Sequence, residues 1–146
     1  MYTSILVPLD GSPRAETILP HVVGMADRYQ ATIHLFRVVE PPSMVPDANA
    51  MHPVQDPQEV QRLHNRAQEY LSGLAAELKH KDLEVLLSLG HGPVVEAILQ
   101  AAETQAIDLI AIASHGRSGL SRVFYGSVAA GLLQRIDRPL LLIRSA

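Results

Sequence analysis

A loop rich in glycine and serine, expected between Ser114 and Ser127, has residue types that could hold an anion. Its glycines Gly116 and Gly119 would let the backbone turn with a positive φ angle or approach a ligand closely. Gly126 and Ser127 open a stretch with helical spacing, where unpaired N–H groups and the helix dipole attract an anion. The Ser127 hydroxyl could also donate to a phosphate oxygen. These residues predict a site for a phosphate-bearing ligand, with turn glycines and a simple N-cap at Ser127 as the alternative interpretation.

Strands and helices that would position this loop alternate along the chain. Apolar runs of strand length occupy residues 5–9, 31–39, 83–89, 107–113 and 138–144. Helical spacing fills residues 13–29, 59–81, 94–105 and 127–136, with Ser12 as the expected N-cap of the first helix and Pro13 at its first position. Because the strands are almost continuously apolar and helices separate them, they predict a parallel sheet covered on both faces. Ligands bind such sheets beyond the carboxyl ends of the strands, where the strand order reverses.

Residues 40–57 contain five prolines and are expected to form no regular element. A connection of this length is either a functional flap or a mobile loop. Met44 and Met51 could cover a ligand from this segment, but nothing in the sequence requires it.

Composition narrows the class of protein. The 146 residues suit one domain, residues 1–146, and the apolar fraction of 47% argues against disorder. A net charge of −3 does not suggest a nucleic-acid-binding protein. No apolar run has membrane-spanning length, and Met1 leads directly into a strand without a signal peptide. With no cysteine present, these features predict a cytoplasmic protein that does not bind a membrane.

Motifs of known enzyme classes and metal sites are missing from the chain. It has no G-x-x-x-x-G-K-[S/T] loop, no G-x-S-x-G turn and no G-x-G-x-x-G after the first strand. The seven histidines show no i,i+4 pair, so we expect no protein-built metal site. If the phosphate-bearing ligand were hydrolysed, the reaction would be slow, with Mg²⁺ held mostly by phosphates and water.

Four segments together resemble the universal stress protein family over essentially the whole chain. They are residues 5–12 (ILVPLDGS), 114–120 (SHGRSGL), 126–128 (GSV) and 138–143 (RPLLLI). This resemblance implies a Rossmann-like, doubly wound α/β fold with a five-stranded parallel sheet of order 3-2-1-4-5. It also implies a role in stress response or signalling.

Nucleotide-binding members of this family carry a G-x-x-G-x9-G-[S/T] signature. In this chain Gly116 matches the second glycine, nine residues follow, and Gly126 and Ser127 match the final pair. Ala113 replaces the first glycine, which places a methyl group where the backbone would approach the ligand. Two hypotheses follow: a protein that binds ATP (or AMP or ADP, with Mg²⁺), or an interaction protein of the same fold whose site Ala113 has closed.

By resemblance, Asp10 and the backbone beside it would face adenine and ribose, and the main chain of Val38 would contact adenine. A turn at Asp10 and a core position for Val38 are the alternatives. Residues of the late loop and the following helix start would hold the ribose and phosphates. The complete set implied at the nucleotide site is Pro8, Leu9, Asp10, Val38, Ala113, Ser114, His115, Gly116, Gly119, Gly126, Ser127 and Val128.

The resemblance further implies a homodimer. Residues 140–143 form an apolar final strand expected at a sheet edge, and an exposed apolar edge is prone to pair with another chain. Pairing with a second copy would cover it, although a helix packed over the edge would do so as well.

Overall fold

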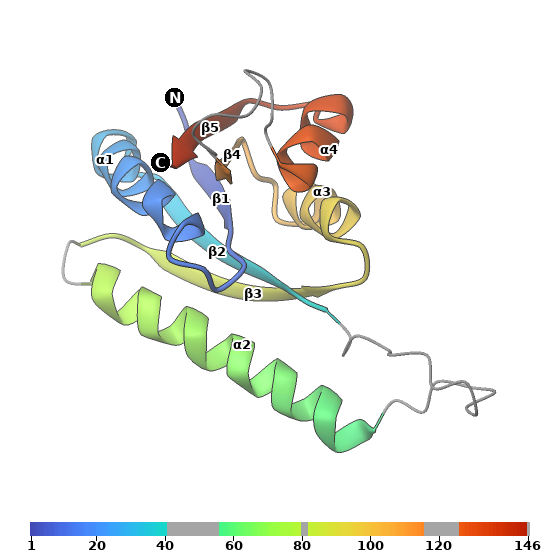
Figure 1. Ribbon diagram of the computed structural model, residues 1–146. Helices are drawn as coiled ribbons and strands as arrows, with labels where there is room; N and C mark the ends of the chain where they lie inside the picture. The colour runs from blue at the N-terminus through green and yellow to red at the C-terminus, as the bar shows by residue number, and fades with distance from the viewer. Residues whose placement is uncertain (41–55, 80–81, 116–125, 146) are drawn as a thin grey trace.

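The computed structural model describes residues 1–40, 56–79, 82–115 and 126–145, which form a parallel sheet between two layers of helices (Figure 1). The strands are β1 (Ser4–Pro8), β2 (Thr32–Val39), β3 (Val85–His91), β4 (Leu109–His115) and β5 (Leu140–Ser145). Their order is β3-β2-β1-β4-β5 and every pairing is parallel. The predicted fold class and strand order are therefore confirmed.

The strand order reverses between β1 and β4. From β1 the chain moves outward to β2 and β3, then returns to place β4 on the other side of β1, with Ile5 opposite Leu109 and Leu6 opposite Ile110. The adjoining loops leave the sheet in opposite directions, which opens a crevice beyond the carboxyl ends of these two strands.

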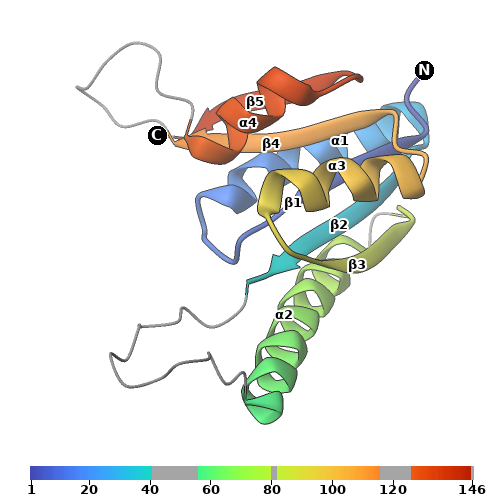
Figure 2. The same cartoon turned by 90° about the vertical axis from the view of Figure 1, so that its right-hand side faces the viewer.

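Two helical layers cover the sheet, as Figure 2 shows from the side of α3 and α4. The short 3-10 helix η1 (Ala15–Ile18), α1 (Leu19–Tyr29) and α2 (Pro57–Leu78) lie on one face, whereas α3 (Val94–Thr104) and α4 (Ser127–Arg135) lie on the other. Successive strand side chains point to opposite faces, so Ile5 packs toward η1, α1 and α2, and Leu6 packs toward α3 and α4. Both faces are buried, which explains the continuously apolar strands.

The first helix differs from the prediction of one continuous helix from Pro13. A 3-10 segment, Ala15–Ile18, precedes the α-helix, which begins at Leu19. Proline at position 20 has no N–H to donate to the carbonyl of residue 16, and its ring would clash with that carbonyl in a continuing α-helix. The Leu19 N–H bonds Glu16 O instead. The Ser12 hydroxyl still accepts from Ala15 N at 3.2 Å, as the predicted cap would.

Several predicted boundaries are wrong by about two residues. Helix α2 begins at Pro57 because the Asp56 carboxylate caps it, accepting from Gln58 N at 3.0 Å. Strand β3 continues to His91, paired with β2. Strand β4 continues to His115, so Ser114 and His115 lie in the strand and not in the loop. The predicted flap or mobile loop (Met44, Met51) falls mainly on residues 41–55, outside the described residues. No helix in the described ranges is long and apolar enough to cross a membrane.

Candidate functional site

A cavity of about 510 Å³ lies at the carboxyl ends of β1, β2 and β4, at the reversal of strand order. This volume is typical of small-molecule sites. The cavity brings together nine of the residues predicted for the site, from four separate parts of the chain: Pro8, Leu9, Asp10, Val38, Ala113, Ser114, Gly126, Ser127 and Val128. His115 ends β4, but its side chain is not described, and Gly116 and Gly119 lie outside the described residues. A role in ligand binding remains a prediction for all twelve.

One wall of the cavity is the amino end of α4. Gly126 is the N-cap, and its φ of 77° and ψ of 159° are values that side-chain-bearing residues rarely adopt. The first intrahelical bond runs from Ala130 N to Gly126 O at 3.0 Å. The N–H groups of Ser127, Val128 and Ala129 therefore have no acceptor inside the helix, and all three residues line the cavity. Ser127 is the first helical residue and not the N-cap, and the exposed donors favour an anion here.

A buried hydroxyl group lies in the same cavity. Ser114 is only 3% exposed, and its Oγ has no hydrogen-bond partner among the described residues. Its carbonyl is satisfied, since Ser145 Oγ donates to it at 3.0 Å. A buried polar group without a partner costs about 1–3 kcal/mol. A ligand oxygen within reach of this hydroxyl would remove that cost.

Asp10 has a structural role that the structure shows directly. Its Oδ1 accepts from Ser12 N at 2.9 Å and from Ser12 Oγ at 2.6 Å, which closes a turn around Gly11 with a φ of 87°. This is the turn that the sequence offered as an alternative. It also holds the carboxylate at the cavity, so the turn and a contact with a ligand are compatible.

Ala113 points away from the helix terminus. Alternate residues of β4 face opposite sides, and its methyl group packs at the margin of the core cluster shared with η1, α1 and α2. Ser114, the next residue, faces the other way. The methyl group therefore lines the cavity from its far side and does not lie beneath the amino end of α4.

The sequence prediction missed several charged lining residues, among them Arg37 and Arg66. Arg37 extends from β2 on the face of α2, and Arg66 extends from α2 itself. A charged residue inside an otherwise apolar strand could have drawn attention to Arg37. No signal in the sequence distinguishes Arg66 from the other arginines of its helix.

Arg37 is held by its neighbours. Its guanidinium carbon lies 5.1 Å from the ring centroid of Tyr70, and a Cβ atom at Gly11 would lie 2.9 Å from its Nη1. Tyr70 in turn donates from its hydroxyl to Glu16 Oε2 at 3.0 Å. Partial burial and this bond to Glu16 raise the pKa of Tyr70 well above its ordinary value, so the phenol stays protonated and the contact persists.

In the part of the chain that the structure describes, no three His, Asp or Glu side chains are grouped to hold an ion. A divalent ion at this cavity would need most of its ligands from a bound phosphate and water.

The sequence profile of the Universal stress protein family matches residues 1–144. The universal stress protein MJ0577 of Methanocaldococcus jannaschii is 24% identical over 155 residues, covering 99% of this chain and 96% of that protein. A solved structure of MJ0577 superposes with a TM-score of 0.81, covering 100% of this chain and 98% of that one.

Two further structures of similar fold contain nucleotides. A universal stress protein in complex with cAMP has a TM-score of 0.70 at 17% identity, covering 99% of this chain and 98% of its own. A universal stress protein family member from Arabidopsis thaliana with AMP bound has a TM-score of 0.66 at 13% identity, covering 99% of this chain and 92% of its own. At these identities the likeness concerns the fold.

Proposed function

The chain belongs to the universal stress protein family, and we propose that it binds a nucleotide in the cavity at the carboxyl ends of β1 and β4. The observation that carries the proposal is the unpartnered Ser114 hydroxyl, buried in the cavity that the amino end of α4 also lines. A phosphate group there would accept hydrogen bonds from Ser114, Ser127 and the backbone N–H groups of α4. Relatives of the same fold that hold cAMP and AMP support this proposal.

The remaining predicted residues take roles around the phosphate. Asp10, with Pro8 and Leu9 beside it, would face the base and ribose, and a free lone pair of the carboxylate could accept from a hydroxyl or amino group. Val38 would contact the base through its main chain. We propose that His115, Gly116 and Gly119 also contact the phosphates. Ala113 would line the side of the cavity that faces away from α4.

ATP is the proposed ligand, with AMP and ADP as shorter candidates, and Mg²⁺ would be bound through the phosphates. The residues described around the cavity include no lysine. Hydrolysis would therefore be slow at most, and nucleotide occupancy would serve stress signalling in the cytoplasm by changing the contacts of the protein with partners.

A homodimer through β5 forms part of the proposal. Strand β5 is at the edge of the sheet, and Leu140, Leu141, Leu142 and Ile143 are each only half-buried. On α4, which packs against the same side of the molecule, Leu133 is 48% exposed. A second copy would cover these side chains. A dimer that binds no nucleotide, with Ala113 closing the site, is the competing function.

The test is thermal unfolding of the protein with and without Mg·ATP, AMP or cAMP. A ligand at 100 times its Kd adds about 2.7 kcal/mol to the free energy of unfolding, which gives a clear rise in Tm. Ser114→Ala should weaken nucleotide binding about tenfold without destabilising the free protein, because the hydroxyl it removes has no partner. Ser72→Ala, on the exposed face of α2, is the control. No shift with any nucleotide at millimolar concentration would refute the proposal and leave the interaction protein.

A further inference from the structure

The cavity wall opposite the amino end of α4 is basic. Arg14 precedes η1, Arg37 extends from β2 and Arg66 extends from α2, and all three line the cavity. Two carboxylates, Asp10 and Glu40, line it as well, so arginines outnumber acids around it. The α4 wall, by contrast, offers neutral N–H and hydroxyl donors.

Arg37 is held between Tyr70 and Gly11, and its guanidinium has no hydrogen-bond acceptor among the described residues. The guanidinium lies over the ring of Tyr70 and against the backbone of Gly11. A guanidinium that rests on a ring with its face keeps its N–H groups free at its edge. Tyr70 is itself anchored to Glu16, so Arg37 is presented in one position before any ligand arrives.

Arg66 lines the same cavity as Arg37. It is four residues before Tyr70 on α2, so the two side chains share one helix face, with their Cβ atoms about 5–6 Å apart. Arg37 rests on the ring of Tyr70, and the side chains of Arg37 and Arg66 both line the cavity from this side.

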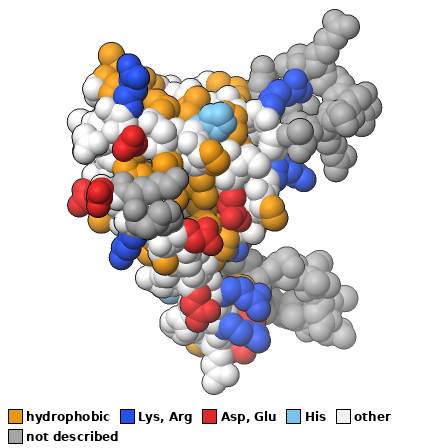
Figure 3. Space-filling model, turned by 90° about the vertical axis from the view of Figure 1, so that its left-hand side faces the viewer, with side chains coloured by type: hydrophobic (Ala, Val, Ile, Leu, Met, Phe, Trp, Pro, Cys, Tyr) orange, Lys and Arg blue, Asp and Glu red, His pale blue; other side chains and the backbone are white. Residues whose placement is uncertain are grey.

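Neither arginine has an acidic partner in the part of the chain that the structure describes. Within the described residues, ion pairs join Arg62 to Glu59, Arg135 to Glu96 and Arg138 to Asp137, and none involves Arg37 or Arg66. The carboxylate of Asp10, which also lines the cavity, accepts from Ser12 through Oδ1. The space-filling view shows basic and acidic side chains side by side on the lower part of the molecule, which α2 forms (Figure 3). Two guanidinium groups that line one ligand-sized cavity, with no ion pair among the described residues, suit a phosphate group.

We infer that Arg37 and Arg66 form a second anion site, and that the cavity prefers, over the 5′-nucleotides named above, a nucleoside bisphosphate with one phosphate at α4 and another on its ribose. The inference rests on the proposed function, which places the 5′-phosphate at α4 and Ser114. The second phosphate would lie on the side of the cavity formed by β2 and α2.

The test compares ligands of identical composition. ADP carries both phosphates at one end, whereas its isomers adenosine 3′,5′-bisphosphate and adenosine 2′,5′-bisphosphate carry them at two. Affinities for the full chain are measured by calorimetry without Mg²⁺, with AMP as the common reference. One bisphosphate should bind about tenfold or more tightly than ADP, the contribution of a charge-assisted hydrogen bond. The two isomers decide which ribose oxygen carries the phosphate.

Variants locate the effect. Arg66→Gln, an exposed helix position, should abolish the preference while leaving the affinity for AMP within about twofold, because AMP has no second phosphate. Arg37→Gln should do the same. Arg62→Gln is the matched control, since Arg62 is paired with Glu59 and does not line this cavity.

Three results would overturn the inference. If ADP binds as tightly as both bisphosphates, the second site is absent and the proposed function stands. If the preference survives in both Arg37→Gln and Arg66→Gln, the second phosphate binds elsewhere. If no nucleotide binds at all, the proposed function fails together with the inference.

Discussion

The two ends of the sheet differ in whether their polar groups have hydrogen-bond partners among the described residues. At the amino end, Asp108 accepts from Thr3 N and Thr3 Oγ1 at 2.7 Å each and from Ser4 N at 3.1 Å. Arg138 donates from Nη1 to the carbonyls of Ala102 and Ile107, both at 2.9 Å. At the carboxyl end, the first N–H groups of α4, the Ser114 hydroxyl, Arg37 and Arg66 lack such partners among the described residues.

This difference indicates that the amino end contributes to stability and that the carboxyl end is suited to binding a ligand. The protein satisfies the amino end itself, so that end contributes to stability. The carboxyl end keeps donors that have no partner among the described residues and that the proposed ligand would satisfy. Substitutions at the amino end should therefore change the free energy of unfolding and leave nucleotide binding intact, whereas substitutions at the carboxyl end should change binding.

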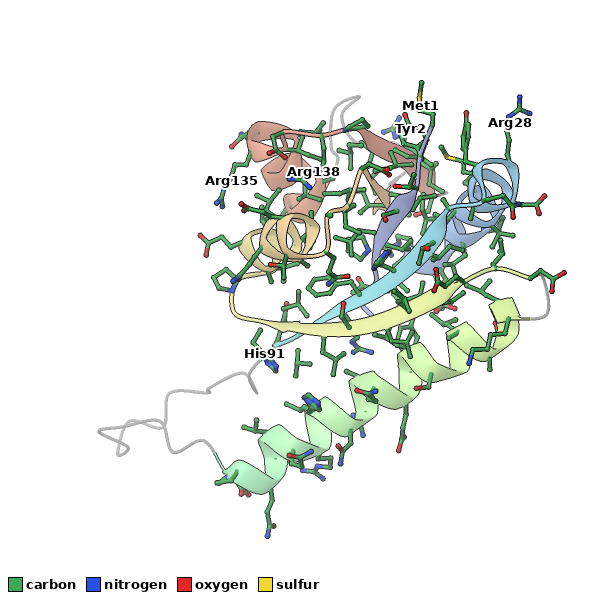
Figure 4. The ribbon with its side chains drawn as sticks, turned by 180° about the vertical axis from the view of Figure 1, so that it is seen from behind. Met1, Tyr2, Arg28, His91, Arg135 and Arg138 are labelled. Carbon is green, nitrogen blue, oxygen red and sulfur yellow. The ribbon has the colours of Figure 1, made fainter. Side chains whose placement is uncertain are left out.

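The largest expected effect on stability is at Arg138. Its side chain is 20% exposed, and Arg138→Met would remove the charged donor from two part-buried carbonyls, lowering the free energy of unfolding by about 2 kcal/mol. Figure 4 shows Arg138 within the fold beside α3 and α4, and Arg135 at its outer surface.

Arg135→Met is the matched control, because the pair of Arg135 with Glu96 is exposed at 3.7 Å and contributes about 0.5 kcal/mol or less. Urea unfolding measures both variants, and AMP titration checks that binding is retained. Equal stability of the two variants, or loss of AMP binding in Arg138→Met, would contradict the assignment of the amino end to stability.

Gly126→Val tests the opposite end. A valine at φ 77° and ψ 159° is strained by about 1–3 kcal/mol, and relief of that strain would move the first turn of α4. We expect both a lower free energy of unfolding and loss of the nucleotide-induced rise in Tm. Gly73→Ala, in an open position on α2, should instead stabilise by about 0.5–1 kcal/mol and keep binding. Retained ATP affinity in Gly126→Val would mean that the phosphate does not bind at α4.

The pH dependence of stability provides a smaller test of the amino end. Partial burial raises the pKa of Asp108, but the hydrogen bonds from Thr3 and Ser4 outweigh it and hold the pKa below its ordinary value. A lowered folded-state pKa stabilises above the unfolded value of about 3.9, and the contribution is lost as the pH falls through the folded pKa.

Asp108→Asn should therefore cost about 1 kcal/mol near neutral pH, with the difference from the unsubstituted protein shrinking below about pH 4. Urea unfolding of both proteins across this range measures it. A difference that stays constant from neutral to acid pH would show that the charge of Asp108 is not what matters.

The smallest effect is expected at Ala113. Because its methyl group faces the η1, α1 and α2 side, Ala113→Gly should change ATP affinity by no more than about threefold and lower stability by about 0.5–1 kcal/mol. Calorimetric titration with ATP measures the change. A hundredfold gain in ATP affinity would support the competing hypothesis that Ala113 closes the site. So would ATP binding by the variant when the unsubstituted protein binds none.

Much of this arrangement could be predicted from the sequence, and the exceptions have physical causes. Continuous apolar strands separated by helices specify a doubly wound sheet, and the family motifs brought the lining residues Asp10, Ser114 and Gly126 together. The change from 3-10 helix to α-helix before Leu19 results from the proline at position 20. The apolar residues recur at helical spacing across this point, so the pattern predicted one continuous helix. Arg37 and Arg66 were missed because their proximity depends on how α2 packs against β2, which no local pattern encodes.

The most direct test of the ligand-ready carboxyl end is an NMR titration of the ¹⁵N-labelled protein with AMP. The account predicts the largest amide shifts at Ser114, Ser127, Val128 and Ala129, with no change at Thr3, Ser4 or Asp108. Amide shifts confined to other surfaces, or none at saturating AMP, would contradict it.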